Sequence, residues 1–325
     1  MLETPFYTIK INANGEFTSL FDKENDREVL QSGKTGNELR IYEDKPLQYS
    51  AWYLDIFHTE KSWKVEGVRR MEWTENGPVR ATLEIEREVM DTVIRQQIHF
   101  YAKDRRIDFE TYVDWKFAEH VLKVHFPADV HSDEATYDIQ FGNVTRKLHT
   151  NTSWDQARFE VCGHKWADLS EGGYGVSLMN DCKYGYSAKG YVLGMSLIKC
   201  GIHPDYAADQ GIHDFIYALY PHSGSWQESG VQKEAWRLNN PLWTVEGAVD
   251  AEVQSAFCKA DTDHVAIDCI KKAEDSEDLI IRFHEYAGMR GPVTLNFGFP
   301  VDSWQETDLM GNPEGDEMKG ELTVT

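Results

Sequence analysis

The densest run of polar and ionisable residues in this 325-residue chain lies between Arg158 and Ser187, interspersed with glycine and aromatic residues. Carboxylates, imidazoles, amines and amides are the groups that exchange protons, ligate metals or hold sugar hydroxyls. From this run and the next polar segment we select ten site candidates: His164, Lys165, Trp166, Asp168, Asn180, Asp181, Lys183, Tyr184, Asp209 and His213.

Glycoside hydrolysis is one chemistry that such residues offer, because it needs two carboxylates across a glycosidic bond. Asp168 and Glu171 lie close together beside an aromatic residue, and Asp181 follows an asparagine. The chain has 55 acidic residues, so composition does not select a pair. Solvated loop acids are the default interpretation of this pattern.

Metal binding and sugar epimerisation are two further chemistries of the same residues. His164 with Asp168, or Asp209 with His213, would offer metal ligands, but neither pair has a recognised spacing. A mutarotase would instead use a histidine and a carboxylate as acid and base at the open end of a sandwich, with His164, His213 and His222 as candidates. The sequence contains no glycine-rich phosphate loop, G-x-S-x-G or H-E-x-x-H motif.

The elements that must position these residues are predicted to be β-strands. Apolar and polar residues alternate over residues 82–89, 107–115 and 122–126, with Lys123 and His125 on the polar side of the last segment. Asn14-Gly15 between two alternating runs predicts a hairpin over residues 6–21. Strand-like pieces at residues 158–161 and 175–179 flank the polar clusters and would present them at strand ends. We therefore predict antiparallel sheets packed face to face and no long helix.

A second domain is predicted after residue 240. The alternation breaks around Asn239-Asn240-Pro241-Leu242, which suggests domains at residues 1–240 and 241–325. Within the second domain the pattern predicts shorter strands at Ser255–Lys259, Val265–Lys271, Leu279–Tyr286 and Val293–Phe297.

Composition narrows the classes of partner and compartment. The net charge of −22 disfavours nucleic acid and anionic membranes, whereas a neutral sugar is compatible with it. The five cysteines include no C-x-x-C pair, which argues for structural thiols in a reducing compartment. Neither a long apolar run nor a signal peptide is visible, so we expect a cytoplasmic protein.

Three aromatic residues near the N-terminus form another candidate feature. Trp52, Tyr53 and Phe57 lie among acidic residues, where aromatic rings stack on sugars or, more often, pack in a core or between domains.

Long stretches of the chain resemble one protein family. FEVCGHKWADLSEGGYGVSLMNDCKYGYSAKG, followed by HPDYAADQGIHDFIYALYPHSGSW, closely resembles the C-terminal β region of family 38 glycoside hydrolases. These are the class II α-mannosidases, and the resemblance is to their bacterial and cytosolic or vacuolar branch. NGEFTSLFDKENDREVL, GNELRIYEDKPLQYSAW, RFHEYAGMRGPVTL and VDSWQETDLMGNPEG extend the resemblance over nearly the whole chain.

The resemblance implies an all-β fold: a galactose-mutarotase-like antiparallel supersandwich followed by a smaller β-sandwich. It also implies a retaining, zinc-dependent hydrolase of α-mannosides, whose zinc ligands and catalytic acids lie in an N-terminal domain that nothing here resembles. No catalytic residue, metal ligand or cofactor is therefore assigned to this chain, which we expect to be inactive alone.

The partners that the resemblance implies are the missing catalytic domain and a mannoside. The ten candidate residues then become candidates for a substrate rim or a domain interface. A stand-alone carbohydrate-binding module and, with less support, a mutarotase-like epimerase are the alternatives, and the sequence leaves oligomerisation open.

Overall fold

The computed structural model describes residues 1–247 and 256–324. The chain forms two compact units, the first comprising Met1–Ile139 and Val144–Pro241 and the second Gln140–Asn143 and Leu242–Thr325. The units are described separately below.

The first unit begins with the predicted hairpin. Its strands β2 (Tyr7–Ile11) and β3 (Phe17–Asp22) pair antiparallel, with Ile9 opposite Leu20. Gly15 in the connecting turn has a φ of 73°, a left-handed conformation that glycine adopts without strain. The short strands β1 (Leu2–Glu3) and β4 (Arg27–Glu28) complete a four-stranded sheet in the order β1-β2-β3-β4. The hairpin prediction is confirmed.

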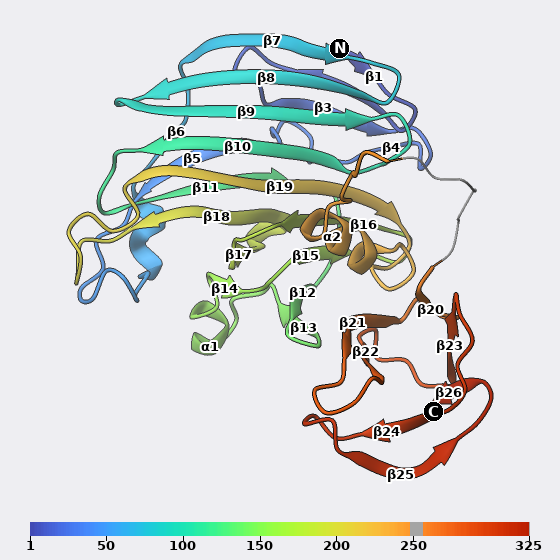
Figure 1. Ribbon diagram of the computed structural model, residues 1–325. Coiled ribbons are helices and arrows are strands. Elements are labelled where there is room, and N and C mark those ends of the chain that lie inside the picture. Colours follow the sequence, from blue (N-terminus) through green and yellow to red (C-terminus); the bar gives the residue numbers. More distant parts are fainter. Residues whose placement is uncertain (248–255, 325) are drawn as a thin grey trace. The chain divides into compact units, whose positions relative to one another are not determined.

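A nine-stranded sheet is the largest element, and its neighbouring strands from β12 to β7 pair antiparallel (Figure 1). In spatial order its strands are β13 (Gly142–Lys147), β12 (Glu134–Ile139), β15 (Trp166–Ser170), β16 (Tyr174–Asn180), β19 (Gly211–Ser223), β10 (Ile107–Trp115), β9 (Thr92–Tyr101), β8 (Arg80–Val89) and β7 (Val68–Asn76).

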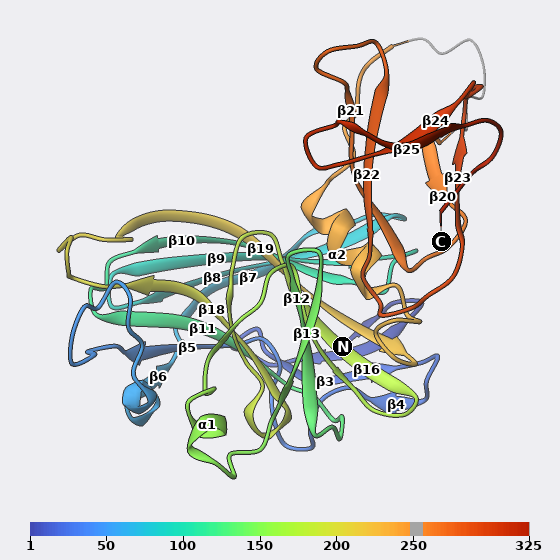
Figure 2. The same cartoon turned by 90° about the horizontal axis from the view of Figure 1, so that it is seen from below.

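A six-stranded antiparallel sheet forms the second layer of this unit, as Figure 2 shows from below. Its order is β14 (Val161–Cys162), β17 (Gly185–Ser187), β18 (Val192–Cys200), β11 (His120–Pro127), β5 (Glu38–Glu43) and β6 (Ser62–Lys64).

The core lies between these sheets and confirms the predicted all-β sandwich. Phe109 on β10 stacks on Tyr217 on β19 with ring centroids 4.8 Å apart, and Phe126 on β11 packs 5.5 Å from Phe109. Alternation along each strand sends such side chains inward and their neighbours outward. Arg87 on β8 is a buried exception, since its guanidinium donates to Gln96 Oε1 at 2.8 Å and to the Asn14 carbonyl at 2.8 Å.

Helices are few in the described part of the chain. They are η1 (Ile56–Glu60), α1 (Ser153–Gln156), η2 (Lys189–Tyr191) and α2 (Val231–Asn239). The strand-based interpretation missed α2, whose buried Val231, Ala235 and Leu238 follow a helical spacing over only nine residues. No described helix is both long and apolar enough to cross a membrane.

The second unit consists of short strands. A three-stranded sheet has the order β20 (Cys258–Ala260), β23 (Val293–Phe297) and β26 (Leu322–Val324), and two hairpins pair β21 (Val265–Lys272) with β22 (Leu279–Glu285) and β24 (Trp304–Thr307) with β25 (Pro313–Met318). The four strands predicted here are present, although Ser255 itself lies outside the described residues. Val293 and Leu295 are the buried residues of β23.

Candidate functional site

The segment 166–170 is a strand of the large sheet, where the sequence predicted a polar cluster at strand ends. Trp166 on β15 is buried; its indole Nε1–H donates to Gln232 Oε1 of α2 at 2.6 Å, and its ring lies 5.0 Å from that of Trp226. This residue therefore attaches α2 to the sheet and offers no surface to a ligand. The polar residues of this segment suggested a loop, so the sequence did not predict a strand here. In the fold the buried polar residues of the strand are hydrogen-bonded to other parts of the protein.

Asp168, two residues further on β15, is also buried. Its carboxylate accepts hydrogen bonds from Ser170 Oγ at 2.5 Å, Ser177 Oγ at 2.6 Å and His222 Nε2 at 2.8 Å. Gly175 lies against this cluster, because an added Cβ would be 2.3 Å from His222 Cε1. The bonds join β15, β16 and β19, so this carboxylate acts as a cross-link between strands.

Asn180 and His164 belong to a second set of contacts at the end of β16. Asn180 is buried; its Nδ2 donates to the His164 carbonyl at 2.9 Å, and its Oδ1 accepts from the Lys183 backbone N–H at 2.5 Å. The Lys165 backbone N–H donates to Asp138 Oδ2 at 2.9 Å, and its ammonium lies 5.3 Å from the Trp236 ring centroid. Asn180 thus fixes the loops that carry its more exposed neighbours.

The remaining candidates are more exposed. Tyr184 is 57 % exposed and places its ring edge-on to His164 at 5.4 Å. Asp181 is exposed, and the ammonium of Lys183 lies 4.3 Å from the Phe215 ring centroid. These side chains have the access that contact with a ligand or a neighbouring domain requires.

Asp209 and His213 meet through the backbone of the aspartate. The Nε2 atom of His213 lies 2.8 Å from the Asp209 carbonyl oxygen, so the carboxylate is not part of this contact. Among the described residues, no group of three or more His, Cys, Asp or Glu side chains gathers in a way that would hold a metal ion.

The ten candidates do not converge on one point. Three of them lie at successive positions along β19. Lys183 contacts Phe215, Asn180 is paired with Tyr217, and Asp168 contacts His222. At about 3.3 Å per strand residue, His213 and His222 are roughly 30 Å apart. Such a separation is incompatible with a single catalytic cluster of all ten.

An exposed aromatic cluster, formed by Tyr49, Trp52, Tyr53 and His203, lies next to the loop that contains Asp209. The ring of Tyr49 lies within 6.0 Å of the other three, and Trp52 is 67 % exposed. Ser50 Oγ accepts from the backbone N–H of His203 at 3.1 Å, which joins the two loops. These rings lie outside the core of the unit.

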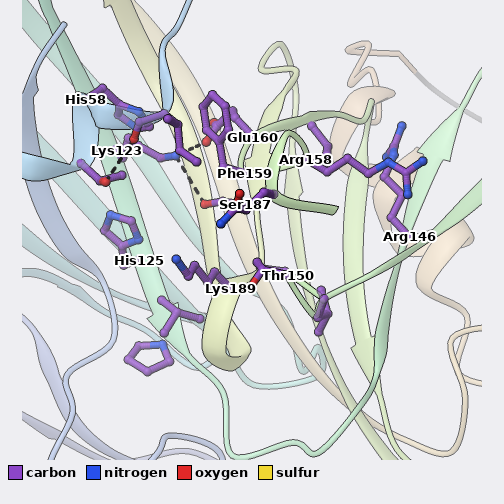
Figure 3. Close-up of a pocket in the computed structure, with 18 of the residues that line it drawn as sticks. His58, Lys123, His125, Arg146, Thr150, Arg158, Phe159, Glu160, Ser187 and Lys189 are labelled. Atoms are coloured by element: carbon purple, nitrogen blue, oxygen red, sulfur yellow. Dashed lines mark hydrogen bonds and ion pairs between the residues drawn. The ribbon is translucent and has the colours of Figure 1, made fainter. Parts of the chain in front are cut away.

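The first unit also contains a pocket of about 510 Å³ on the six-stranded sheet, shown in Figure 3. On β11, Lys123 is buried and bonds to Glu160, while Ser196 Oγ donates to the other Glu160 oxygen at 2.6 Å. His125, two residues along, bonds through Nε2 to the Tyr42 hydroxyl at 2.9 Å. Sequence reasoning placed Lys123 and His125 on a polar strand face, and that face lines this pocket.

Burial governs ionisation in the pocket. It lowers the pKa of His125 to about 3, with further lowering by the nearby Lys123 and Arg40 charges. Burial also lowers the pKa of His58 and raises that of Tyr42 to about 12. At neutral pH these histidines are uncharged and Tyr42 keeps its proton.

Comparison with known proteins matches this chain to one family over both units. The model of the glycosyl hydrolases family 38 C-terminal domain matches residues 2–207, and that of the glycosyl hydrolases family 38 C-terminal beta sandwich domain matches residues 264–325. The chain belongs to glycosyl hydrolase family 38 and corresponds to the C-terminal region of its members.

Individual relatives are α-mannosidases. The chain is 40 % identical over 308 residues to alpha-mannosidase G of Dictyostelium discoideum, covering 91 % of this chain and 28 % of that protein. It is 36 % identical to human alpha-mannosidase 2C1, covering 99 % of this chain and 31 % of the relative. It therefore spans less than a third of these relatives.

A solved structure shares the fold. The crystal structure of an alpha-mannosidase from Enterococcus faecalis V583 superposes with a TM-score of 0.80 at 16 % identity, covering 99 % of this chain and 40 % of that one. This agreement supports the predicted fold class, a supersandwich followed by a smaller β-sandwich.

Proposed function

We propose that this chain is the C-terminal β region of a retaining, zinc-dependent α-mannosidase that hydrolyses α-mannosides. The observation that carries the proposal is the family match over residues 2–207 and 264–325, combined with coverage of only 28 to 31 % of the relatives named above. In this proposal the chain supports a catalytic domain and completes the rim of its active site.

The zinc ion of such an enzyme would be held by residues of that catalytic domain. The described residues of this chain gather no set of metal ligands, and Asp168 is occupied by three hydrogen bonds. These side chains do not fit a zinc site, so we derive no catalytic step through them and propose that the chain alone is inactive.

The exposed aromatic cluster is the surface that we propose faces the catalytic domain. Large exposed rings such as Trp52 and Tyr49 carry an unfavourable contact with water that burial against another domain would remove. Asp209 and His213 adjoin this surface through the loop that Ser50 fixes.

The ten candidate residues divide into two proposed roles. Asp181, Lys183, Tyr184, His164, Lys165, Asp209 and His213 retain some exposure and are proposed to contact the mannoside or the catalytic domain. Trp166, Asp168 and Asn180 are buried and are proposed to hold the strands and loops that carry the others.

The proposed organisation is a supersandwich domain at residues 1–240 and a β-sandwich domain at residues 241–325. We further propose a cytoplasmic location, which the absence of cysteine pairing suits: all five cysteines are free, and burial raises the pKa of Cys182 and Cys200 to about 11.

Turnover of p-nitrophenyl α-mannoside with added zinc tests the proposal. The purified 325-residue chain should release no nitrophenol, whereas a longer polypeptide that joins it to its own upstream coding sequence should. Activity that copurifies with the short chain, and that persists in a chelator, would contradict the assignment of catalysis to another domain.

A carbohydrate-binding module is the second candidate, favoured by the pocket and its aromatic wall residues Tyr42, Tyr137 and Phe159. Calorimetry with mannose and mannobiose separates the two functions, because a scaffold gives no binding heat at millimolar sugar. An epimerase is less well supported, since none of its candidate histidines, His164, His213 and His222, lines the pocket.

A further inference from the structure

The pocket on the six-stranded sheet is rich in positive charge, although the chain as a whole carries a net charge of −22. Seven of its described lining residues are lysine or arginine, whereas three are aspartate or glutamate. In Figure 3, Arg146 and Arg158 lie on one side and His58, Lys123 and His125 on the other, with Lys189 between them. A cationic cavity in so acidic a protein calls for a specific explanation.

Each acid of the pocket already has a basic partner. Glu160 pairs with Lys123, and Glu38 pairs with Arg40 at 2.8 Å. Asp155 lies 3.3 Å from His149 and 3.9 Å from Arg158, and Lys147 pairs with Glu134 outside the pocket at 2.7 Å. The pocket's own carboxylates therefore leave part of its positive charge unbalanced.

Three cations remain without an acidic partner among the described residues: Lys34, Arg146 and Lys189. The guanidinium of Arg146 lies over the Tyr137 ring, 4.8 Å from its centroid, and its buried Nη1 has no hydrogen-bond acceptor. A buried donor without an acceptor is costly, and an anionic ligand would supply one.

His58 is a second unsatisfied group in the wall. Its side chain is 4 % exposed, Nδ1 lies 2.9 Å from the Asp55 carbonyl, and Nε2 has no partner. An Nδ1–H that donates to this carbonyl leaves Nε2 as an acceptor for a ligand hydroxyl. The pocket thus offers cationic donors together with a neutral acceptor.

The cavity is larger than a free phosphate ion requires and falls in the range of pockets that hold small molecules. The rings of Phe159, Tyr42 and Tyr137 line it, and the hydroxyls of Ser187 and Thr150 add polar contacts. Aromatic faces and hydroxyl groups suit a sugar ring, whereas Arg146, Lys34 and Lys189 suit a dianion.

We propose that this pocket binds a phosphorylated monosaccharide, with the phosphate held by Arg146 and Lys189 and the sugar ring against the aromatic wall. The site is separate from the proposed mannosidase function and does not depend on it. Phosphate is the part of the ligand that the unpaired cations select, and the sugar is the part that the remaining volume accommodates.

Isothermal titration calorimetry of the 325-residue chain tests the proposal with mannose 6-phosphate, glucose 6-phosphate, mannose and inorganic phosphate. At least one sugar phosphate should bind, inorganic phosphate should bind more weakly, and mannose should give no measurable binding heat. Binding should weaken as salt rises, because charge pairs at a partly open site are screened. Equal affinity for inorganic phosphate would refute the sugar site, and no binding heat from any of the three phosphate compounds would refute the anion site.

Matched substitutions locate the binding. Arg146→Gln and Lys189→Gln should each weaken sugar phosphate binding by about tenfold or more, since each removes a charge-assisted hydrogen bond. Arg95→Gln and Lys116→Gln change basic residues that do not line the pocket and should leave affinity unchanged. Lys189 is exposed, so its variant remains informative if Arg146→Gln unfolds; unchanged affinity in Lys189→Gln would contradict the proposed phosphate contact.

Discussion

At the scale of single residues, the buried polar groups of this protein hold strands together more than they expose reactive atoms. Asp168 shows this most directly, because all three of its hydrogen-bond donors, Ser170, Ser177 and His222, belong to the sheet or its turns. In the sequence, a polar residue that cross-links strands looks the same as one that contacts a ligand. The two are distinguished by burial, because a residue that cross-links strands is inaccessible to a ligand.

Replacing Asp168 should therefore affect stability strongly. We expect Asp168→Ala to lower the free energy of unfolding by about 3 kcal/mol, because it leaves buried donors on Ser177 and His222 without an acceptor. Urea denaturation measures the loss. Asp181→Ala, an exposed acid in the same segment, should change it by less than about 0.5 kcal/mol, and equal effects of the two would refute the cross-link.

The buried His125 should make stability depend on pH. Burial lowers its pKa to about 3 in the folded chain from an ordinary value of 6.5. Between these values the unfolded chain binds the extra proton, so folding should weaken as pH falls from 7 towards 4, by up to about 1.4 kcal/mol per pH unit. Above pH 7 this contribution is constant.

Unfolding midpoints at several pH values check this expectation. His125→Gln should flatten the acid limb of the profile, whereas His203→Gln, which changes an exposed histidine, should keep the parent slope. A slope that His125→Gln leaves intact would assign the acid sensitivity to other groups.

At the scale of elements, two tryptophans that both lie near acidic residues in the sequence differ in their burial. Trp166 lies between β15 and α2 and bonds to Gln232, whereas Trp52 lies in an exposed loop. The sequence made Trp166 a candidate for a substrate rim or domain interface, and for Trp52 it left open stacking on a sugar, core packing and inter-domain packing. The contacts within the first unit bury Trp166 and leave Trp52 exposed, so Trp52 is not part of this unit's core.

Paired substitutions should reveal this difference. Trp166→Ala should lower the free energy of unfolding by about 3–5 kcal/mol through the cavity that it creates, and protection of α2 amides from hydrogen exchange should fall. Trp52→Ala should leave stability within about 0.5 kcal/mol. The expectation fails if Trp52→Ala destabilises the chain as much as Trp166→Ala does.

At the scale of the whole molecule, the first unit contains the main hydrophobic core. The members of that core run from Tyr7 to Leu219 and include the stacked pair Phe109 and Tyr217. A unit with its own core meets the main physical requirement for folding by itself.

A chain that ends at Pro241 should therefore fold. We expect its near-ultraviolet circular dichroism to keep the signals of packed aromatic residues and its urea unfolding to remain one cooperative transition. The full chain is the reference for both measurements. Loss of the near-ultraviolet signal in the shorter chain would show that the first unit needs residues beyond Pro241.

The sequence by itself determined most of the strands, the Asn14-Gly15 hairpin and the antiparallel sandwich, because alternation and turn residues act over short distances. The family followed from the resemblance of long stretches of the chain, whereas the strand at 166–170 was missed and residues 158–160, read as part of a strand, are not one. Tertiary structure alone decided that Trp166, Asp168 and Asn180 are buried and that Lys123 lines a pocket with Arg146 and Lys189. Those outcomes depend on pairing between distant strands, such as β11 with β18, and local sequence does not specify which distant strands will pair. The polar segment from Arg158 to Ser187 thus identified the family correctly, while its position in the fold separated residues that support strands from those left accessible.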